Sequence, residues 1–207
     1  MTSAYEEKVI PAQDLLDAAR AAATSRGPER QRTFVRELSG KYSEIYKKLF
    51  SEPRIIHAGD QKWGGGPQLY GKSPIDPDRV DSTQLFHCHF ELLAPGAKSQ
   101  KHGHMNTAAF YILEGDGYDV HDGKKLPWQA GDVCIVEPGC VHQHFNNDPE
   151  HPAKMLIMKS KPVYLFANLG FQGFVEGAPK EPIPGFEDWL PQEVIDQGGP
   201  VGHGVTD

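Results

Sequence analysis

The sequence predicts an all-β domain, a sandwich or barrel, with helices before it and an irregular arm after it. Gly and Pro, at 22 and 17 residues, are frequent enough to favour many turns. Between residues 82 and 168, short β-like runs alternate with turn residues, a pattern typical of sandwiches and barrels. These runs cover residues 83–93, 108–113, 117–121, 133–136 and 155–158, and we expect the last run to continue towards Phe166. The length of 207 residues suits one such domain with extensions.

Four segments can be separated along the chain. Residues 1–56 predict a helical N-terminal extension, because apolar residues recur there at spacings of one, three and four. Residues 57–81 have no clear period and include three consecutive glycines, which predicts a loop or arm: a lid carrying Trp63 and Tyr70, or a subunit contact. Residues 82–168 hold the barrel. Residues 169–207 predict a C-terminal arm that lies on the barrel or on a partner subunit.

Charge and composition exclude several classes of protein. The 21 basic and 28 acidic residues give a net charge of -7, which disfavours a nucleic-acid partner. No apolar run reaches 18 residues, and the first ten residues carry acids where a signal peptide carries bases. We therefore expect a cytoplasmic chain with no membrane partner. The three cysteines lack the spacing of a disulfide framework or a zinc site.

Two pairs of histidines carry the chemical signal. His102 and His104 are two residues apart, and so are His142 and His144. On a strand, residues at this spacing share one face. Two such strands facing one interior offer three or four nitrogen ligands to a transition metal.

A third pair, His87 and His89, alternates with an apolar face formed by Phe86, Cys88 and Phe90. We expect these two histidines to have a structural role, because they lie on the opposite face of their strand.

The residues around the two main pairs resemble the two motifs of the cupins. Gly96, His102-x-His104 and Gly115 resemble the first motif, and the stretch from Gly131 through Pro138-Gly139-x-x-His142-x-x-x-Asn146 resembles the second. This resemblance implies a double-stranded β-helix, a jelly-roll barrel, with His102, His104 and His142 as metal ligands.

Two positions depart from the usual cupin pattern. Glu137 stands where the second motif has proline, and Ala108 stands where the first motif has a glutamate ligand. The missing glutamate, together with Phe110 and the later His144, resembles the gentisate dioxygenase group, which uses three histidines. That resemblance implies Fe(II), with Zn, Ni, Mn or Cu as alternatives.

The activity implied is a dioxygenase reaction between O2 and a hydroxylated aromatic carboxylate or a similar chelating organic acid, as in aromatic compound degradation. One alternative is a non-oxidative metal-dependent cupin: an isomerase, decarboxylase or lyase. A second alternative is a cupin that binds a small molecule without converting it.

His144 is the candidate catalytic residue beside the three ligands. It can be a hydrogen-bond partner of the site, a proton-transfer group or a packed side chain. The N-terminal helices and the aromatic C-terminal arm provide more apolar surface than a small barrel needs, so we expect a homodimer or a higher homo-oligomer.

Overall fold

The computed structural model describes residues 47–48, 50–76 and 85–202. Residues 1–51 form a unit separate from the rest of the chain, and residues 47, 48, 50 and 51 are helical. Residues 52–56, the end of the predicted helical extension, are not helical, and the remaining residues of that extension lie outside the described part of the chain. Within the described part of the chain, no helix is both long and apolar enough to cross a membrane.

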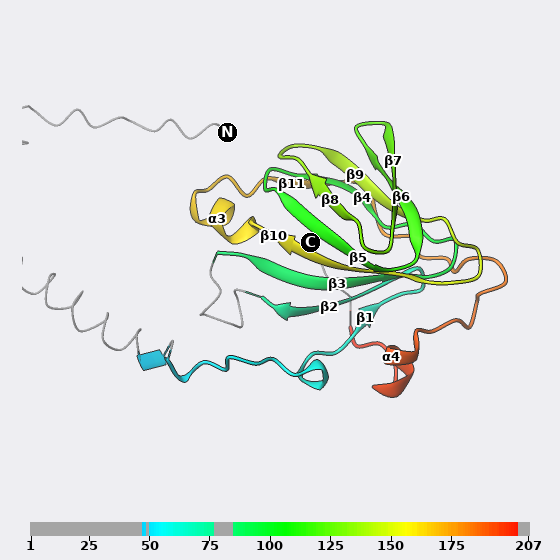
Figure 1. Ribbon diagram of the computed structural model, residues 1–207, viewed down its shortest axis with the longest axis horizontal. Helices are drawn as coiled ribbons and strands as arrows, with labels where there is room; N and C mark the ends of the chain where they lie inside the picture. Colours follow the sequence, from blue (N-terminus) through cyan, green and yellow to red (C-terminus); the bar gives the residue numbers. More distant parts are fainter. Residues whose placement is uncertain (1–46, 49, 77–84, 203–207) are drawn as a thin grey trace, which may run out of the picture. The chain divides into compact units, whose positions relative to one another are not determined.

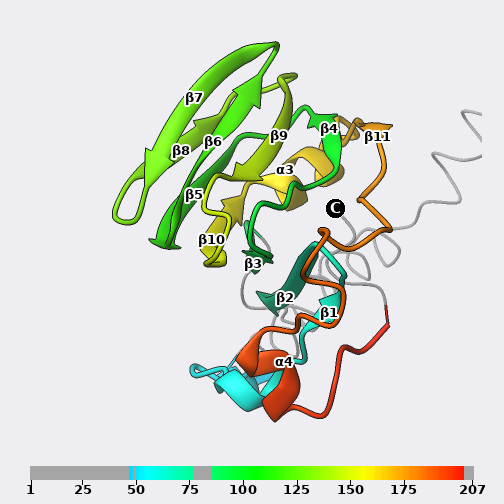
Figure 2. The same ribbon diagram turned by 90° about the vertical axis from the view of Figure 1, so that its right-hand side faces the viewer.

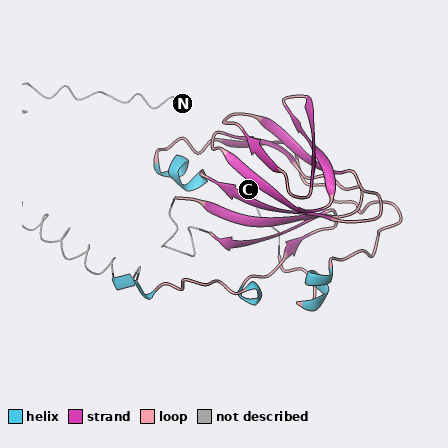
Figure 3. Cartoon of the chain, in the orientation of Figure 1, coloured by secondary structure: helices cyan, strands magenta, loops and turns pink. Residues whose placement is uncertain are grey.

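Two antiparallel sheets form the barrel (Figures 1 and 3). Sheet A has six strands, in the order β1 (Gly64–Gly65), β2 (Leu69–Ile75), β3 (His87–Leu93), β10 (Ala153–Lys159), β5 (Ala108–Glu114) and β8 (Val133–Val136). Sheet B has five strands, in the order β11 (Gln172–Glu176), β4 (Lys101–His104), β9 (Val141–Asn146), β6 (Asp116–His121) and β7 (Lys124–Gln129). The predicted β barrel is confirmed as two antiparallel sheets, and each predicted β-like run overlaps one strand. The last run does not continue towards Phe166, because β10 ends at Lys159 and a helix follows it.

The inner face of sheet A changes from apolar to polar along its strands. At one end Leu93 of β3 pairs with Ala153 of β10, and both are fully buried. At the other end, His87 and Ala108 are the register partners of Lys159 on its two sides. One hydrophobic cluster fills the apolar end. The polar side chains at the other end are therefore available to line a site.

The prediction of a loop over residues 57–81 is wrong in part, because β1 and β2 lie there, after a short 3₁₀ helix, η1 (Ala58–Asp60). Trp63 and Tyr70 form a second cluster with Leu92 and with Val194 of α4 (Gln192–Asp196). Leu92 and Leu93 are neighbours on one strand and belong to different clusters, so the second cluster covers the outer face of sheet A at β2 and β3 (Figure 2). These aromatic side chains therefore pack on the barrel and do not form a lid.

The C-terminal segment packs along the barrel. After α3 (Lys161–Phe166), strand β11 pairs with β4 and extends sheet B. This pairing brings the ring of Phe174 to 5.9 Å from the ring of His102. Trp189 packs against both hydrophobic clusters.

Candidate metal centre

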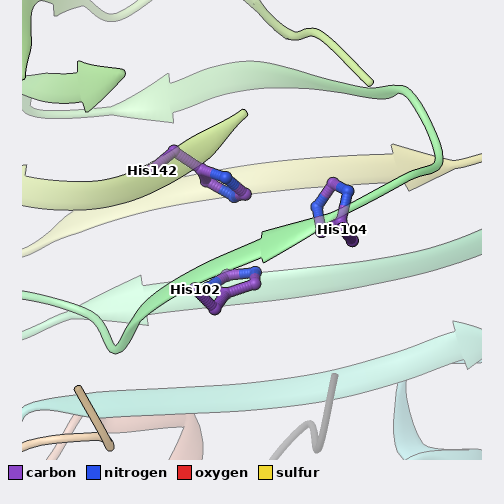
Figure 4. Close-up of side chains that lie close together, drawn as sticks. All are labelled: His102, His104 and His142. Atoms are coloured by element: carbon purple, nitrogen blue, oxygen red, sulfur yellow. The ribbon is translucent and has the colours of Figure 1, made fainter. Parts of the chain in front are cut away.

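Three histidine side chains from neighbouring strands of sheet B converge inside the barrel (Figure 4). His102 and His104 alternate with Gly103 on β4, and His142 is the register partner of His102 on β9. One ring nitrogen from each histidine lies within 4.8 Å of the others. The ring centres of His102 and His104 lie 4.3 Å and 4.9 Å from that of His142. The structure thus brings the three predicted metal ligands together.

Backbone carbonyl groups orient two of the three rings. Nδ1 of His104 lies 2.7 Å from the carbonyl oxygen of Asn106, and Nδ1 of His142 lies 3.3 Å from that of Cys140. A carbonyl only accepts, so Nδ1 donates its proton and Nε2 keeps the lone pair that a metal needs. Nε2 of His104 is buried and has no hydrogen-bond partner among the described residues. A metal ion fits this unsatisfied atom.

The electrostatic state of the cluster also suits a cation. Burial lowers the pKa of all three imidazoles, to about 3 for His102, about 4 for His104 and about 2 for His142. The rings are therefore neutral at pH 7, which is the form that binds a metal.

A small cavity of about 10 Å³ lies against the three rings. That is about the room needed for one water molecule or one ion. Sheet B contributes the imidazoles, and sheet A contributes the opposite wall. The lining residues are Glu91, His102, His104, Ala108, Phe110, Val136, His142, His144, Ile157 and Lys159. The wall is apolar in its middle and charged at Glu91 and Lys159.

His144 lies on the same face of β9 as His142 and lines the cavity, but it is not part of the three-nitrogen cluster. Its Nδ1 lies 2.9 Å from Oδ2 of Asp119. Burial would lower the pKa of His144, but the charge and the hydrogen bond of Asp119 outweigh burial and raise it. The carboxylate thus favours an imidazole that carries a proton on Nδ1.

Sequence reasoning missed Asp119, which connects three donors. Its carboxylate also accepts a hydrogen bond of 2.9 Å from Nε1 of Trp128 and lies 3.1 Å from Nε2 of His121. Burial would raise the pKa of Asp119, but the charge of His144 and these hydrogen bonds lower it. Asp119 and His121 are two residues apart, so the spacing that revealed the other histidine pairs was present here too.

Two further residues of the cavity lie on sheet A, and sequence reasoning missed both. Glu91 accepts a hydrogen bond of 3.2 Å from Nε2 of the fully buried His89. Burial would raise the pKa of Glu91, but this hydrogen bond and nearby positive charges lower it. Burial lowers the pKa of Lys159 to about 7. His89 does lie opposite the apolar face of β3, as predicted, and its partner Glu91 lines the cavity.

Comparison with known proteins identifies the barrel. The family model of the cupin domain matches residues 89–159. The oxalate-binding protein of Thermotoga maritima is 30% identical over 97 residues, which cover 42% of this chain and 80% of that protein. The chain belongs to the cupins. Every residue that lines the cavity lies inside the matched range, so the cupin domain alone supplies the candidate metal centre.

Larger cupin proteins also resemble the chain. The gentisate 1,2-dioxygenase of a Haloferax species is 26% identical over 94 residues, which cover 45% of this chain and 23% of that enzyme. The structure of a salicylate 1,2-dioxygenase from Pseudaminobacter salicylatoxidans aligns with a TM-score of 0.48 and 16% identity, over 54% of this chain and 31% of that one. The chain thus spans about a quarter of the length of the gentisate dioxygenase that it resembles.

Proposed function

We propose that the protein is an Fe(II)-dependent dioxygenase that acts on a hydroxylated aromatic carboxylate or a similar chelating organic acid. One observation carries the proposal: three neutral imidazoles converge on the cavity, and Ala108, at the position of the usual cupin glutamate, adds no charge to it. When bound, Fe(II) supplies a place where a chelating acid and O2 meet, and a route for electrons between them. The likeness to a gentisate dioxygenase supports the same choice.

In this proposal, different residues of the cavity bind the cation, exclude water and attract the acid. The His102, His104 and His142 rings hold the cation on one side and leave the side toward sheet A open. Phe110, Val136 and Ile157 exclude water there. Lys159 brings an amine to the same cavity, and the protonated form of this amine favours an anionic acid.

In this proposal, His144 holds a proton beside the bound acid. Its Nδ1–H donates to Asp119, so Nε2 is the atom that faces the rest of the cavity. Phe110 packs against the ring, with the two ring centres 4.9 Å apart, and limits its rotation.

An oxygen-electrode experiment tests the proposal. The full chain is loaded with Fe(II) under anaerobic conditions and then screened in air against catechols, gentisate-like acids and salicylate-like acids. We expect about one iron per chain and O2 uptake equal to the loss of one of these acids. His142→Ala should lose both iron and O2 uptake, because it removes one of three ligands. His151→Ala is the matched control, since the His151 side chain is 72% exposed and lies outside the cavity.

Full iron occupancy in His142→Ala would contradict the ligand assignment. Iron binding without O2 uptake, for every acid tested, would contradict the dioxygenase reaction and leave the site as a metal centre of another kind.

The second candidate is the binding of a small acid without chemical conversion. A cavity of about 10 Å³ has to open less for a small acid than for an aromatic acid, so its size favours this candidate. The likeness to an oxalate-binding protein, 80% of whose length is matched, supports it as well. Oxalate recovered unchanged after stoichiometric binding to the metal-loaded chain, with no O2 uptake, would favour this candidate.

A further inference from the structure

A second group of metal-ligand atoms lies beside the three-histidine cluster. It consists of a ring nitrogen of His121, a carboxylate oxygen of Glu137 and Sγ of Cys140, all within 4.8 Å of one another. Strand β6 supplies His121, and the turn between β8 and β9 supplies the other two residues. His121 is the register partner of His142, and their ring centres lie 5.9 Å apart. The two groups are therefore neighbours that share no ligand.

The orientation of His121 is that of a metal-binding histidine. Its Nε2 lies 3.1 Å from Oδ2 of Asp119, which accepts the proton of that nitrogen. Its Nδ1 is buried and makes no hydrogen bond within the described part of the chain, although Oε2 of Glu137 lies 3.3 Å away. Ligating histidines commonly donate their second ring nitrogen to a carboxylate in this way. His121 is only 6% exposed, and its Nδ1 lies inside the group, facing Glu137.

We propose that His121, Glu137 and Cys140 form a second cation site, suited to Zn²⁺, that is separate from the three-histidine centre. One nitrogen, one oxygen and one sulfur donor match the ligands that zinc accepts, and three protein ligands leave a position for water. This proposal does not depend on the dioxygenase activity.

Distances and charges support such a site. Tetrahedral zinc with bonds of about 2.0 to 2.3 Å needs ligand atoms roughly 3.3 to 3.8 Å apart. The His121 and Glu137 atoms already have this separation, at 3.3 Å. Glu137 and the nearby Asp122 place negative charge around Cys140, which favours a cation. Glu137 is exposed, so an ion can enter from solvent without passing the first centre.

Cobalt(II) provides a direct test, because a thiolate ligand gives Co(II) a charge-transfer absorption in the near ultraviolet that imidazole ligands do not give. The reduced full chain is titrated with Co(II) under anaerobic conditions. We expect two ions per chain and a thiolate band. Cys140→Ser should abolish the band, and Cys134→Ser should keep it, because Cys134 lies outside the group. His104→Ala should keep the band and lose the other ion.

Glu137→Gln keeps the test decisive if the buried variants fail to fold. The Glu137 side chain is 66% exposed, so the substitution should leave the fold intact. We expect it to lower the affinity for the Co(II) ion that gives the thiolate band by about 10-fold or more. A titration that shows no thiolate band, or a band that persists in Cys140→Ser, would overturn the proposal. His121 would then be a bridge between two carboxylates and not a ligand.

Discussion

Nδ1 of His144 lies 3.0 Å from Oδ1 and 2.9 Å from Oδ2 of Asp119, and both side chains are almost fully buried. Asp119 also accepts hydrogen bonds from His121 and from Trp128. A single carboxylate therefore fixes the orientation of two histidines beside the candidate metal centre, and an indole anchors that carboxylate.

Asp119→Asn tests this arrangement at nearly constant volume. The asparagine amide has only one acceptor oxygen, and its NH2 group would face one of the groups that now donate to Asp119. At least one of these buried donors therefore loses its partner. We expect the free energy of unfolding to fall by about 1 to 3 kcal/mol. Turnover should fall by about 10-fold to 100-fold, while the three-histidine centre keeps its metal. Urea unfolding, metal analysis and turnover together check this prediction.

Asp116→Asn is the control for this substitution, because Asp116 is exposed and lies on the same strand. Equal losses in the two variants would show that the buried carboxylate has no special role.

Ala108 faces the candidate metal centre, and its neighbour Ala109 does not. Ala108→Glu should still bind metal but should bind an organic acid at least 10-fold more weakly, because the new carboxylate occupies a coordination position and cancels part of the charge. Titration of the metal-loaded variants with an aromatic hydroxy acid, without O2, measures this affinity. Ala108→Gln separates the effect of size from that of charge, and Ala109→Glu is the matched control on the same strand. Equal affinity in wild type and Ala108→Glu would contradict the prediction.

The thiols of Cys88 and Cys134 should react slowly in the native protein. Burial raises the pKa of Cys88 to about 11, and burial with the charges of Asp119 and Asp132 raises that of Cys134 to about 12. A raised pKa leaves less thiolate at a given pH, and the thiolate is the reactive form. From a usual value of 9.0, a pKa of about 11 lowers the thiolate fraction at pH 8 by about 100-fold.

Alkylation by iodoacetamide, followed by mass spectrometry, measures this effect. The two thiols should label at least 10-fold more slowly in the native chain than in urea, and raising the pH should speed the native reaction. Equal rates in the two states would contradict the prediction.

The outer face of sheet A carries an apolar surface on β5, β8 and β10. Ala109 pairs with Ile135 and Met158, and Tyr111 pairs with Val133, so these side chains form two adjacent rows. Ile135 is 60% exposed and Val133 63%, and β8 is an edge strand among the described residues. We propose that a second copy of the chain covers this surface, because such a face is favourable for a homodimer.

Ile135→Lys should weaken self-association by at least 10-fold, because it places a charge in the interface. Light scattering over a range of concentrations measures the change. Ile195→Lys is the control, since Ile195 is 51% exposed on α4 and lies outside this surface. A monomer in the wild type, or equal association in both variants, would contradict the proposal.

The barrel strands and the convergence of the three histidines could be predicted because period-two patterns are local. His102 and His104, and His142 with His144, show their shared faces in the sequence itself. Strand β2 was missed because its residues Leu69–Ile75 combine Gly, Lys and Pro with few apolar side chains. Its stability comes from long-range packing of Tyr70 against Leu92, which no local pattern contains.

The partners of the histidines were harder to predict for the same reason. Asp119 becomes the partner of His144 only when β6 pairs with β9, and Glu91 reaches the cavity from the other sheet. Which carboxylate meets which imidazole depends on strand register, and register is set by the whole sheet.

The two sheets contribute differently to the cavity: sheet B carries all the imidazoles, and sheet A carries the facing side chains of Phe110, Ile157 and Lys159. Mutation in sheet A can therefore change which molecules enter the cavity while the imidazole groups of sheet B keep their positions. New ligand specificities in such a barrel can evolve by separate steps on one sheet. The same three positions are the ones to vary in a library that aims to change the ligand specificity of this protein.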